Sequence, residues 1–190
     1  MTDELIDILD SKGNPTGSRL MKSEAHANGL WHYSVHVWIF NSRGEVLLQK
    51  RAMSKDTFPG LWDISSAGHV SAGETPNEAA VRELGEELGI KAKTGDLKRA
   101  MVRELESEPR PGLHNNEHVH VYFLKFEGDA KSLKIQKKEL EEVKFILLDE
   151  FEADLKDKEK KKAYAPNSRP HDYFLEIIRA IRKELEAEKS

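Results

Sequence analysis

Three glutamates in one short segment are spaced so that they could bind a metal ion together. Glu83, Glu86 and Glu87 stand at positions i, i+3 and i+4, which share one face if the segment is helical. Like charges at these spacings destabilise a helix, and a divalent cation would reverse that penalty. Carboxylate oxygens suit Mg²⁺ or Mn²⁺, whereas the simplest alternative is an acidic helix face that contacts only water.

The residues before these glutamates predict where the helix begins and what precedes it. Thr75 is suited to be the N-cap, a proline follows it, Glu78 completes a capping box, and Gly89 can end the helix. The sequence therefore predicts a helix over residues 75–88. Two glycines and Glu74 come just before it, which indicates a tight loop whose backbone can approach a ligand closely.

Residues 68–90 as a whole match the pattern G-x5-E-x7-R-E-U-x-E-E-x-G-U, where U is aliphatic, at every fixed position. This segment closely resembles the Nudix box, the motif of the Nudix family. The resemblance implies an α+β fold, an α/β/α sandwich in which a central mixed sheet lies between helices. It also implies an enzyme that hydrolyses a diphosphate linkage in a small molecule, typically a nucleoside diphosphate linked to another group.

Carried over residue by residue, the resemblance implies roles within the box. The ligands of Mg²⁺, or of Mn²⁺ in its place, would be Glu83, Glu86, Glu87 and the Gly68 carbonyl group. Arg82 would orient Glu83, and Glu74 would support the loop electrostatically. The chemistry agrees, because cations that bridge a diphosphate neutralise its charge and lower the pKa of a bound water.

Two glutamates are candidates for the general base that activates this water. Glu83 is the first choice. Glu117 is the second, because some Nudix enzymes use a glutamate from a distant loop, and residues 106–116 contain prolines and a glycine that predict a loop. We expect residues 106–117 to determine substrate specificity. The competing interpretation of Glu117 is an ordinary surface glutamate.

A second resemblance lies upstream of the box. The sequences V-L-L-Q-K-R at residues 46–51 and P-G-L-W-D at 59–63 are similar to the isopentenyl-diphosphate isomerase branch of the superfamily. In that branch the residues matching Arg51 and Lys55 contact the substrate diphosphate, and the alternative is a pair of solvated cations. The isomerases have a catalytic cysteine where this chain has Ala67, so hydrolysis is favoured over isomerisation.

Several histidines are candidates for metal binding. His26, His32 and His69 approximately match a metal site of the isomerases, which would make His69 a supporting residue next to the box. His118 and His120 lie close to the second candidate base, and imidazole suits transition metals. Core or surface histidines are the competing interpretation. The three tryptophans could stack on a base, although aromatic residues in strands more often belong to the core.

Composition narrows the class of protein. The chain has 190 residues, 30 Lys+Arg against 34 Asp+Glu, a formal net charge of −4 and no cysteine. The absence of cysteine excludes disulfides, Cys-ligated zinc and thiol nucleophiles. With no long apolar run, no signal peptide and a mildly acidic charge, we expect a cytoplasmic protein that binds neither membranes nor nucleic acid. The expected partner is a small-molecule diphosphate, and a homodimer is compatible because paired domains are frequent among Nudix proteins.

The remaining pattern predicts a single domain over residues 1–190. Residues 31–40 and 45–49 are β-branched and aromatic runs around a short Gly-containing loop, which predicts a hairpin. Apolar residues at helical spacing predict a C-terminal amphipathic helix over about residues 170–187, packed on the core. Further strands are expected near residues 4–9, 97–105, 119–126 and 143–148.

Two other functions compete with hydrolysis. A non-catalytic Nudix-like domain would bind a metabolite without turnover, but such domains can dispense with box glutamates and this chain keeps all of them. An isomerase with a substituted acid such as Glu117 would need a raised pKa to protonate an alkene.

Overall fold

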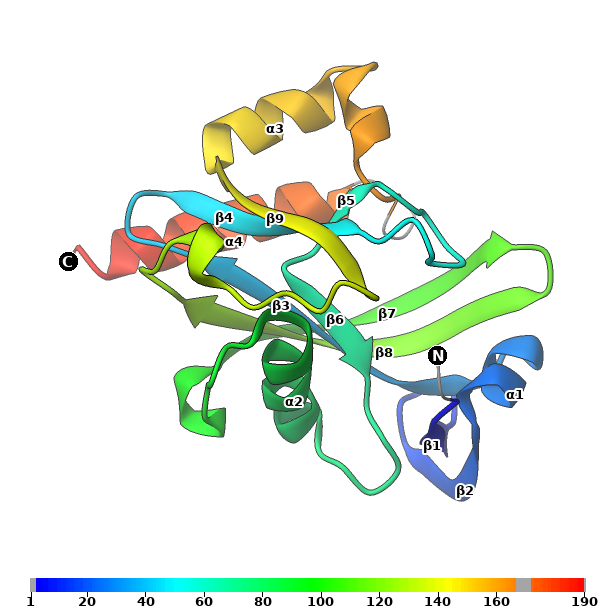
Figure 1. The fold of residues 1–190 in the computed structure, drawn as a ribbon. Coiled ribbons are helices and arrows are strands. Elements are labelled where there is room, and N and C mark those ends of the chain that lie inside the picture. Colours follow the sequence, from blue (N-terminus) through cyan, green and yellow to red (C-terminus); the bar gives the residue numbers. More distant parts are fainter. Residues whose placement is uncertain (1–2, 167–171, 190) are drawn as a thin grey trace.

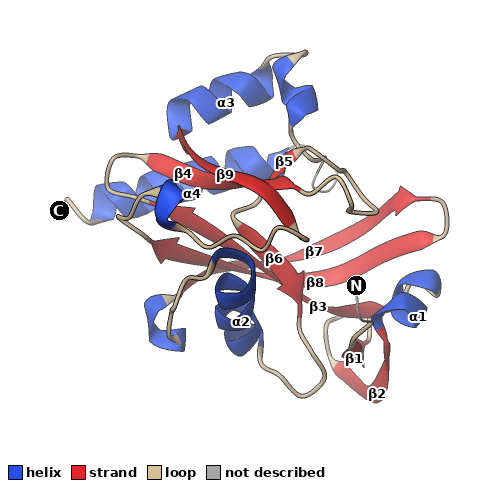
Figure 2. Ribbon diagram, in the orientation of Figure 1, coloured by secondary structure: helices blue, strands red, loops and turns tan. Residues whose placement is uncertain are grey.

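The computed structural model describes residues 3–166 and 172–189 and shows a mixed β-sheet with helices on both faces (Figure 1, Figure 2). Helix α2 (Pro76–Leu88) packs on one face, and α3 (Leu148–Lys156) and α4 (Asp172–Ala187) pack on the other. The predicted α+β sandwich is confirmed. The other elements are β1 (Leu5–Leu9), β2 (Pro15–Met21), α1 (Lys22–Ala27), β3 (Trp31–Phe40), β4 (Glu45–Arg51), β5 (Trp62–Asp63), β6 (Ser66–His69), β7 (Lys98–Arg110), β8 (Leu113–Lys125) and β9 (Leu140–Leu147), with short 3₁₀ turns at Thr94–Asp96, Ala130–Ser132 and Lys160–Ala163.

Strand β3 lies at the centre of the sheet, with strands paired on both of its edges, and most of its side chains are buried because helices cover both faces. Along one edge it runs parallel to β8 over its whole length. Along the other edge it pairs antiparallel with β1 and then with β6, where Ser34 lies opposite His69. The start of the Nudix-like segment is therefore next to the most buried strand of the molecule.

The predicted hairpin of residues 31–40 and 45–49 is only partly correct. Both strands exist, but β3 and β4 pair only at Phe40 and Val46. Beyond this point β4 pairs with β9 and β5, while β3 pairs with β6 and β8. Both strands are largely buried, and each pairs with a different set of neighbouring strands. As a result, β4 and β6 are both neighbours of β3 but do not pair with each other in the described sheet.

Residues 106–116 are not a loop, and that prediction is wrong. β7 continues to Arg110 and β8 starts at Leu113, so the two strands form a long hairpin (Figure 1). Gly112 makes the turn with a φ of 78°, a conformation that favours glycine. In the described sheet β7 pairs only with β8, and an edge strand tolerates Pro109 because one of its edges donates to no neighbour.

Helix α2 begins and ends where the sequence predicts. Thr75 Oγ1 accepts a hydrogen bond from the Glu78 N–H, and the Glu78 carboxylate accepts one from the Thr75 N–H, so the capping box is present. Gly89 ends the helix with a φ of 67°. Leu84 and Leu88 are fully buried against the sheet, which fixes the rotation of the helix and the direction of its glutamates.

The C-terminal helix packs on the core as predicted. Residues 170–171 of the predicted range lie outside the described residues, and α4 itself covers Asp172–Ala187. Its buried residues join Trp38 and Phe151 in the core: Tyr173, Phe174, Ile177, Ile178 and Ile181. Among the described helices, none has the length and apolar composition to cross a membrane.

Candidate active site and metal centres

Helix α2 holds the Glu83 carboxyl group directly against strand β6. A Cβ atom at Gly68 would collide with this carboxyl group, so a glycine is required at that position. The Glu83 side chain is largely buried. Burial raises the pKa of Glu83 to about 7, contact with Arg82 opposes the rise, and repulsion from Glu86 adds to it.

Arg82 connects the loop before the helix to the helix itself. Its Nε and Nη2 donate to the two carboxylate oxygens of Glu74, each at 3.0 Å. Its Nη1 donates to Glu83 Oε1 at 2.6 Å, and Nη2 also donates to the His69 carbonyl at 2.9 Å. A planar guanidinium with several donors is suited to such a set of partners. These are the contacts that an orienting Arg82 and a loop-supporting Glu74 require, and the catalytic roles themselves stay predictions.

Glu87 and Glu86 lie in very different environments. Glu87 is buried, and its Oε2 accepts hydrogen bonds from Ser66 Oγ at 2.6 Å and from the Ala67 N–H at 3.2 Å. Burial raises the pKa of Glu87 to about 8, the Ser66 hydrogen bond opposes the rise, and repulsion from Glu83 adds to it. Glu86 is 55% exposed and lies on the open side of the helix.

These carboxyl groups fit a divalent cation. Glu83 and Glu87 are buried together and repel each other, and a positive ion would offset that repulsion. Hard carboxylate oxygens suit Mg²⁺ or Mn²⁺, and the Glu86 carboxylate is exposed to solvent. The structure therefore brings Gly68, Glu83 and Glu87 together at β6, with Glu86 one turn away on the outside.

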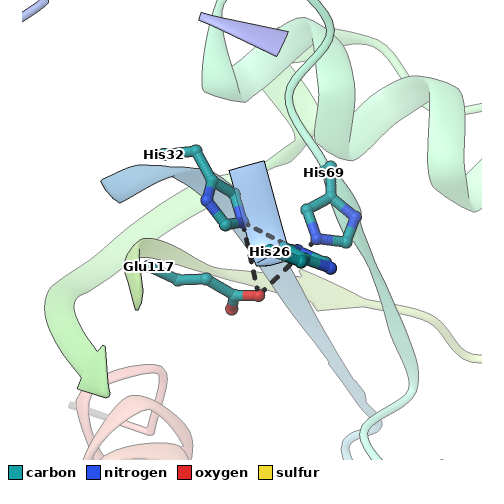
Figure 3. A group of neighbouring side chains, drawn as sticks. All are labelled: His26, His32, His69 and Glu117. Atoms are coloured by element: carbon teal, nitrogen blue, oxygen red, sulfur yellow. Dashed lines mark hydrogen bonds and ion pairs between the residues drawn. The ribbon is translucent and has the colours of Figure 1, made fainter. Parts of the chain in front are cut away.

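A second group of side chains, here called the histidine cluster, consists of His26, His32, His69 and Glu117 (Figure 3). One ligand atom from each lies within 4.8 Å of all the others. His26 Nε2 and His32 Nε2 are 3.2 Å apart, and Glu117 Oε1 lies 3.7 Å from His32 Nε2 and 3.6 Å from His69 Nε2. Ligands of a tetrahedral ion are about 3.4 Å apart, so these spacings fit a transition metal after small adjustments.

Neighbouring groups orient the histidine cluster for metal binding. His32 Nδ1 lies 2.9 Å from a backbone carbonyl, an acceptor that favours a proton on Nδ1 when Nε2 binds a metal. Ser34 Oγ donates to Glu117 Oε2 at 3.0 Å, which leaves Oε1 facing the histidines. Burial, with repulsion from the other histidines, lowers the pKa of His26 to about 4, so this ligand is neutral at pH 7. His69 Nε2 is buried without a hydrogen-bond partner among the described residues.

The position of Glu117 differs from the sequence prediction. It lies inside β8, not at the end of a loop, and is buried within the histidine cluster. Burial opposes its ionisation, but contacts with the cluster histidines hold the pKa of Glu117 well below its usual range. His118 and His120 do not join the cluster, and His118 packs on Trp31 with ring centroids 4.9 Å apart.

The two predicted diphosphate ligands, Arg51 and Lys55, lie at the end of β4 and in the segment that follows it. Arg51 folds back on this segment, and its Nη1 lies 3.1 Å from Asp63 Oδ2. Lys55 forms an ion pair with Glu139, and its charge acts on Glu87. The structure therefore places Lys55 close enough for its charge to act on the box glutamate Glu87, whereas the Arg51 guanidinium forms an ion pair with Asp63.

Sequence reasoning missed two charged residues that reach the site from the N-terminal part of the chain. Glu4 Oε1 accepts a hydrogen bond from Lys22 Nζ at 2.7 Å and lies 3.6 Å from His69 Nδ1. Its charge also acts on Arg82 and Glu83. Neither residue belongs to a motif, because long-range contacts bring this part of the chain to β6: β1 pairs with β3, and Ile6 also bridges to Ser71, just after β6.

A mixed sheet between helices, with an acidic helix packed on a glycine-containing strand, defines the class of domain to which this site belongs. A family model described as the NUDIX domain matches residues 30–166. The chain therefore belongs to the Nudix hydrolase family, as the sequence predicts.

Individual relatives support this membership. Nudix hydrolase 3 of Arabidopsis thaliana is 39% identical over 155 residues, which is 80% of this chain but only 20% of that protein, so the chain spans about a fifth of its length. An isopentenyl-diphosphate Delta-isomerase of Serratia proteamaculans is 36% identical over 126 residues, 66% of this chain and 68% of that protein. The crystal structure of DR0079 from Deinococcus radiodurans shares the fold, with a TM-score of 0.64 at 20% identity over 93% of this chain and 98% of that one.

Proposed function

We propose that this chain is a Mg²⁺-dependent hydrolase that cleaves the diphosphate linkage of a small molecule, a nucleoside diphosphate linked to another group. The observation that carries the proposal is the joint burial of Glu83 and Glu87 at β6. Two neighbouring buried carboxyl groups cannot both ionise without a cost in free energy, and a cation bound between them would remove that cost. Membership in the Nudix family supports hydrolysis of such compounds in general.

In the proposed mechanism the box residues hold the ion and the attacking water. Glu83, Glu86, Glu87 and the Gly68 carbonyl would bind Mg²⁺, with Mn²⁺ as a substitute. The bound ion would neutralise phosphoryl oxygens and lower the pKa of a water molecule. Arg82 keeps the Glu83 carboxylate in place through the 2.6 Å contact, and Glu74 fixes Arg82 from its other side.

Positive charge for the substrate comes from the end of β4 and the segment after it. Lys55 acts on Glu87 and therefore also on a diphosphate bound beside it. We propose that Arg51 serves the same diphosphate, exchanging part of its contact with Asp63 for phosphoryl oxygens, which suit a guanidinium.

We assign the general base to Glu83, not to Glu117. A base must offer a carboxylate oxygen to the attacking water. Glu83 lies among the proposed Mg²⁺ ligands, whereas Glu117 has Oε2 on Ser34 and Oε1 facing His32 and His69. Glu117 is better suited to be a metal ligand of the histidine cluster.

The histidine cluster adds a second proposed metal, a transition metal such as Zn²⁺ or Mn²⁺. Its four ligands come from four different elements: α1, β3, β6 and β8. A metal held there would connect the N-terminal elements to the sheet.

A turnover screen tests the proposed function. The full chain is assayed with Mg²⁺, and with EDTA as control, against nucleoside diphosphates, nucleotide sugars, dinucleoside polyphosphates and isoprenoid diphosphates. Glu83→Gln should lower kcat by about 10²–10⁴-fold, and Glu87→Gln should strongly reduce the Mg²⁺-dependent turnover. Glu142→Gln, which alters an exposed glutamate of β9, is the control and should leave turnover unchanged.

Two outcomes of the screen would contradict the proposal. Unchanged Mg²⁺-dependent turnover in Glu87→Gln would show that the metal assignment is wrong. Isomer formation from an isopentenyl diphosphate would instead support the isomerase function, against which Ala67 argues. A cytoplasmic location, a homodimer, the lack of a nucleic-acid partner and a single domain over residues 1–190 stay predictions.

A further inference from the structure

We propose that Glu139 is a positioning residue for Lys55. It holds the ammonium group of Lys55 beside the box glutamates, so that an arriving diphosphate meets a positive charge already in place. The inference rests on the proposed diphosphate-binding function and adds a residue that lies outside both sequence resemblances.

Glu139 and Lys55 form an ion pair between two separate segments of the chain. Lys55 follows β4, whereas Glu139 comes immediately before β9. Their side chains are only 18% and 21% exposed, so water screens the pair weakly. The nearby pair of Lys50 and Glu141 is looser, with 3.5 Å between Nζ and Oε2 and Glu141 47% exposed.

The backbone of Glu139 is fixed relative to helix α2. The Gln136 N–H donates to the Glu87 carbonyl at 2.9 Å, and the Glu139 N–H donates to the Gln136 carbonyl at 2.9 Å. On its other side, the Glu139 carbonyl accepts from the Ala52 N–H at 2.9 Å. One short segment therefore connects the end of α2 to the residues that carry Lys55, and Glu139 sets where the ammonium group lies relative to Glu87.

The effect on substrate binding follows from the flexibility of lysine. Ordering a lysine side chain on a phosphate costs conformational entropy, and a carboxylate that already orders it removes part of this cost. The ammonium group has three donors, so Lys55 can keep one on Glu139 while another contacts a phosphoryl oxygen. The opposite effect is competition, in which Glu139 withholds Lys55 from the substrate and its removal tightens binding.

Calorimetry with a non-hydrolysable diphosphate separates these effects. The full chain is titrated with methylenediphosphonate in the presence of Mg²⁺, as wild type, Glu139→Ala, Lys55→Met and the double variant. We expect Glu139→Ala to raise Kd about tenfold and Lys55→Met about 30-fold, which is the range for losing one charge-assisted hydrogen bond. The double variant should bind no more weakly than Lys55→Met, because Glu139 acts only through Lys55. Glu141→Ala, which removes the partner of Lys50, should change Kd by less than about twofold.

The results that would overturn the inference are equally specific. They are an unchanged or lower Kd in Glu139→Ala, or a double variant whose loss is the product of the two single losses. Melting temperatures report whether Glu139→Ala folds. If it does not, Glu139→Met preserves the length of the side chain without an acceptor for Lys55, and a Kd equal to that of the wild type would also overturn the inference. If the wild type itself does not bind methylenediphosphonate, the proposed function fails first and this inference with it.

Discussion

Replacing Glu87 by glutamine should stabilise the metal-free protein at alkaline pH and weaken its response to Mg²⁺. Burial raises the pKa of Glu87 from 4.5 to about 8 in the folded chain. Between these pH values the folded chain keeps a proton that the unfolded chain has lost, so the free energy of unfolding falls as the pH rises. Glutamine has nearly the same shape, can accept the hydrogen bonds from Ser66 and Ala67, and has no proton to lose.

The magnitude of this effect follows from the pKa. At about 1.4 kcal/mol per pKa unit, a rise of the pKa from 4.5 to about 8 lowers the free energy of unfolding at pH 9 by roughly 5 kcal/mol, relative to acidic pH. Roughly 2 kcal/mol of this is already lost at pH 6, because the carboxyl group is ionised there in the unfolded chain. The stability of Glu87→Gln relative to wild type should therefore rise by about 2–3 kcal/mol between pH 6 and pH 9.

Urea unfolding in EDTA at pH 6 and at pH 9 measures this difference, and repeating it with Mg²⁺ measures the weakened response. Glu142→Gln is the matched control, since Glu142 is an exposed glutamate of β9 that lies outside both proposed metal sites. The difference between its stability and that of the wild type should change much less between the two pH values than the difference for Glu87→Gln. A difference between Glu87→Gln and wild type that stays constant, or that shrinks toward pH 9, would refute the reasoning.

Three further changes test separate parts of the molecule. Thr75→Ala removes the N-cap of α2 and should lower the free energy of unfolding by about 1 kcal/mol in urea denaturation; an unchanged value would show that the cap is not needed. Tyr173→Phe removes the hydroxyl that lies 2.8 Å from His36 Nδ1 and 3.0 Å from Trp38 Nε1, and should cost about 1–3 kcal/mol in the same assay, because the buried Trp38 and the half-buried His36 each lose a partner. His32→Ala should abolish the rise in melting temperature that Zn²⁺ or Co²⁺ gives the wild type, and an undiminished rise would place the metal elsewhere.

Helix α2 could be predicted with its bounds because all its determinants are local. Thr75, Glu78 and Gly89 mark its ends, and the spacing of Leu84 and Leu88 sets its buried side. Once these are fixed, the direction of each glutamate follows from helical geometry. The part of the site that lies on this helix can therefore be predicted from the sequence. The place of Gly68 cannot, because the sequence indicates a tight loop there, whereas Gly68 lies in β6 and makes room for the Glu83 carboxyl group.

The hairpin of β7 and β8 could not be predicted from the signals that we weighted most. Two prolines and Gly112 normally end a strand, but an edge strand tolerates proline, and here the turn needs only Pro111-Gly112. The decisive signal was the alternation of exposed Glu104, Glu106 and Glu108 with half-buried residues, which has the period of a strand.

The histidine cluster is the part of the site that the sequence predicts least well, because its members are far apart in the sequence. The family resemblance indicates the three histidines, but the sequence predicts a loop next to Glu117 and a role for it as a general base. Its true position depends on β8 running parallel to β3, which brings Glu117 opposite His32. Such a long-range register is a property of the whole sheet, and no local pattern encodes it.

Strand β6 separates the two sets of proposed metal ligands. Gly68 lies opposite Val35, whose side chain belongs to the core beneath α2. His69 lies opposite Ser34, which donates to Glu117. Successive residues of a strand point to opposite faces of the sheet, so the side chains of one set do not reach an ion held by the other. The two sets therefore define two centres.

The two centres are nevertheless connected through Arg82. Its guanidinium donates to the His69 carbonyl at 2.9 Å and to Glu83 Oε1 at 2.6 Å. A metal that fixed the His69 imidazole would also restrain the His69 backbone, and through Arg82 the Glu83 carboxylate. The proposed hydrolysis would need an ion at the glutamates, which are open to solvent through Glu86, whereas the histidine cluster is largely buried. Under that proposal, a metal bound by the histidines would have a supporting role and would not be a second catalytic ion.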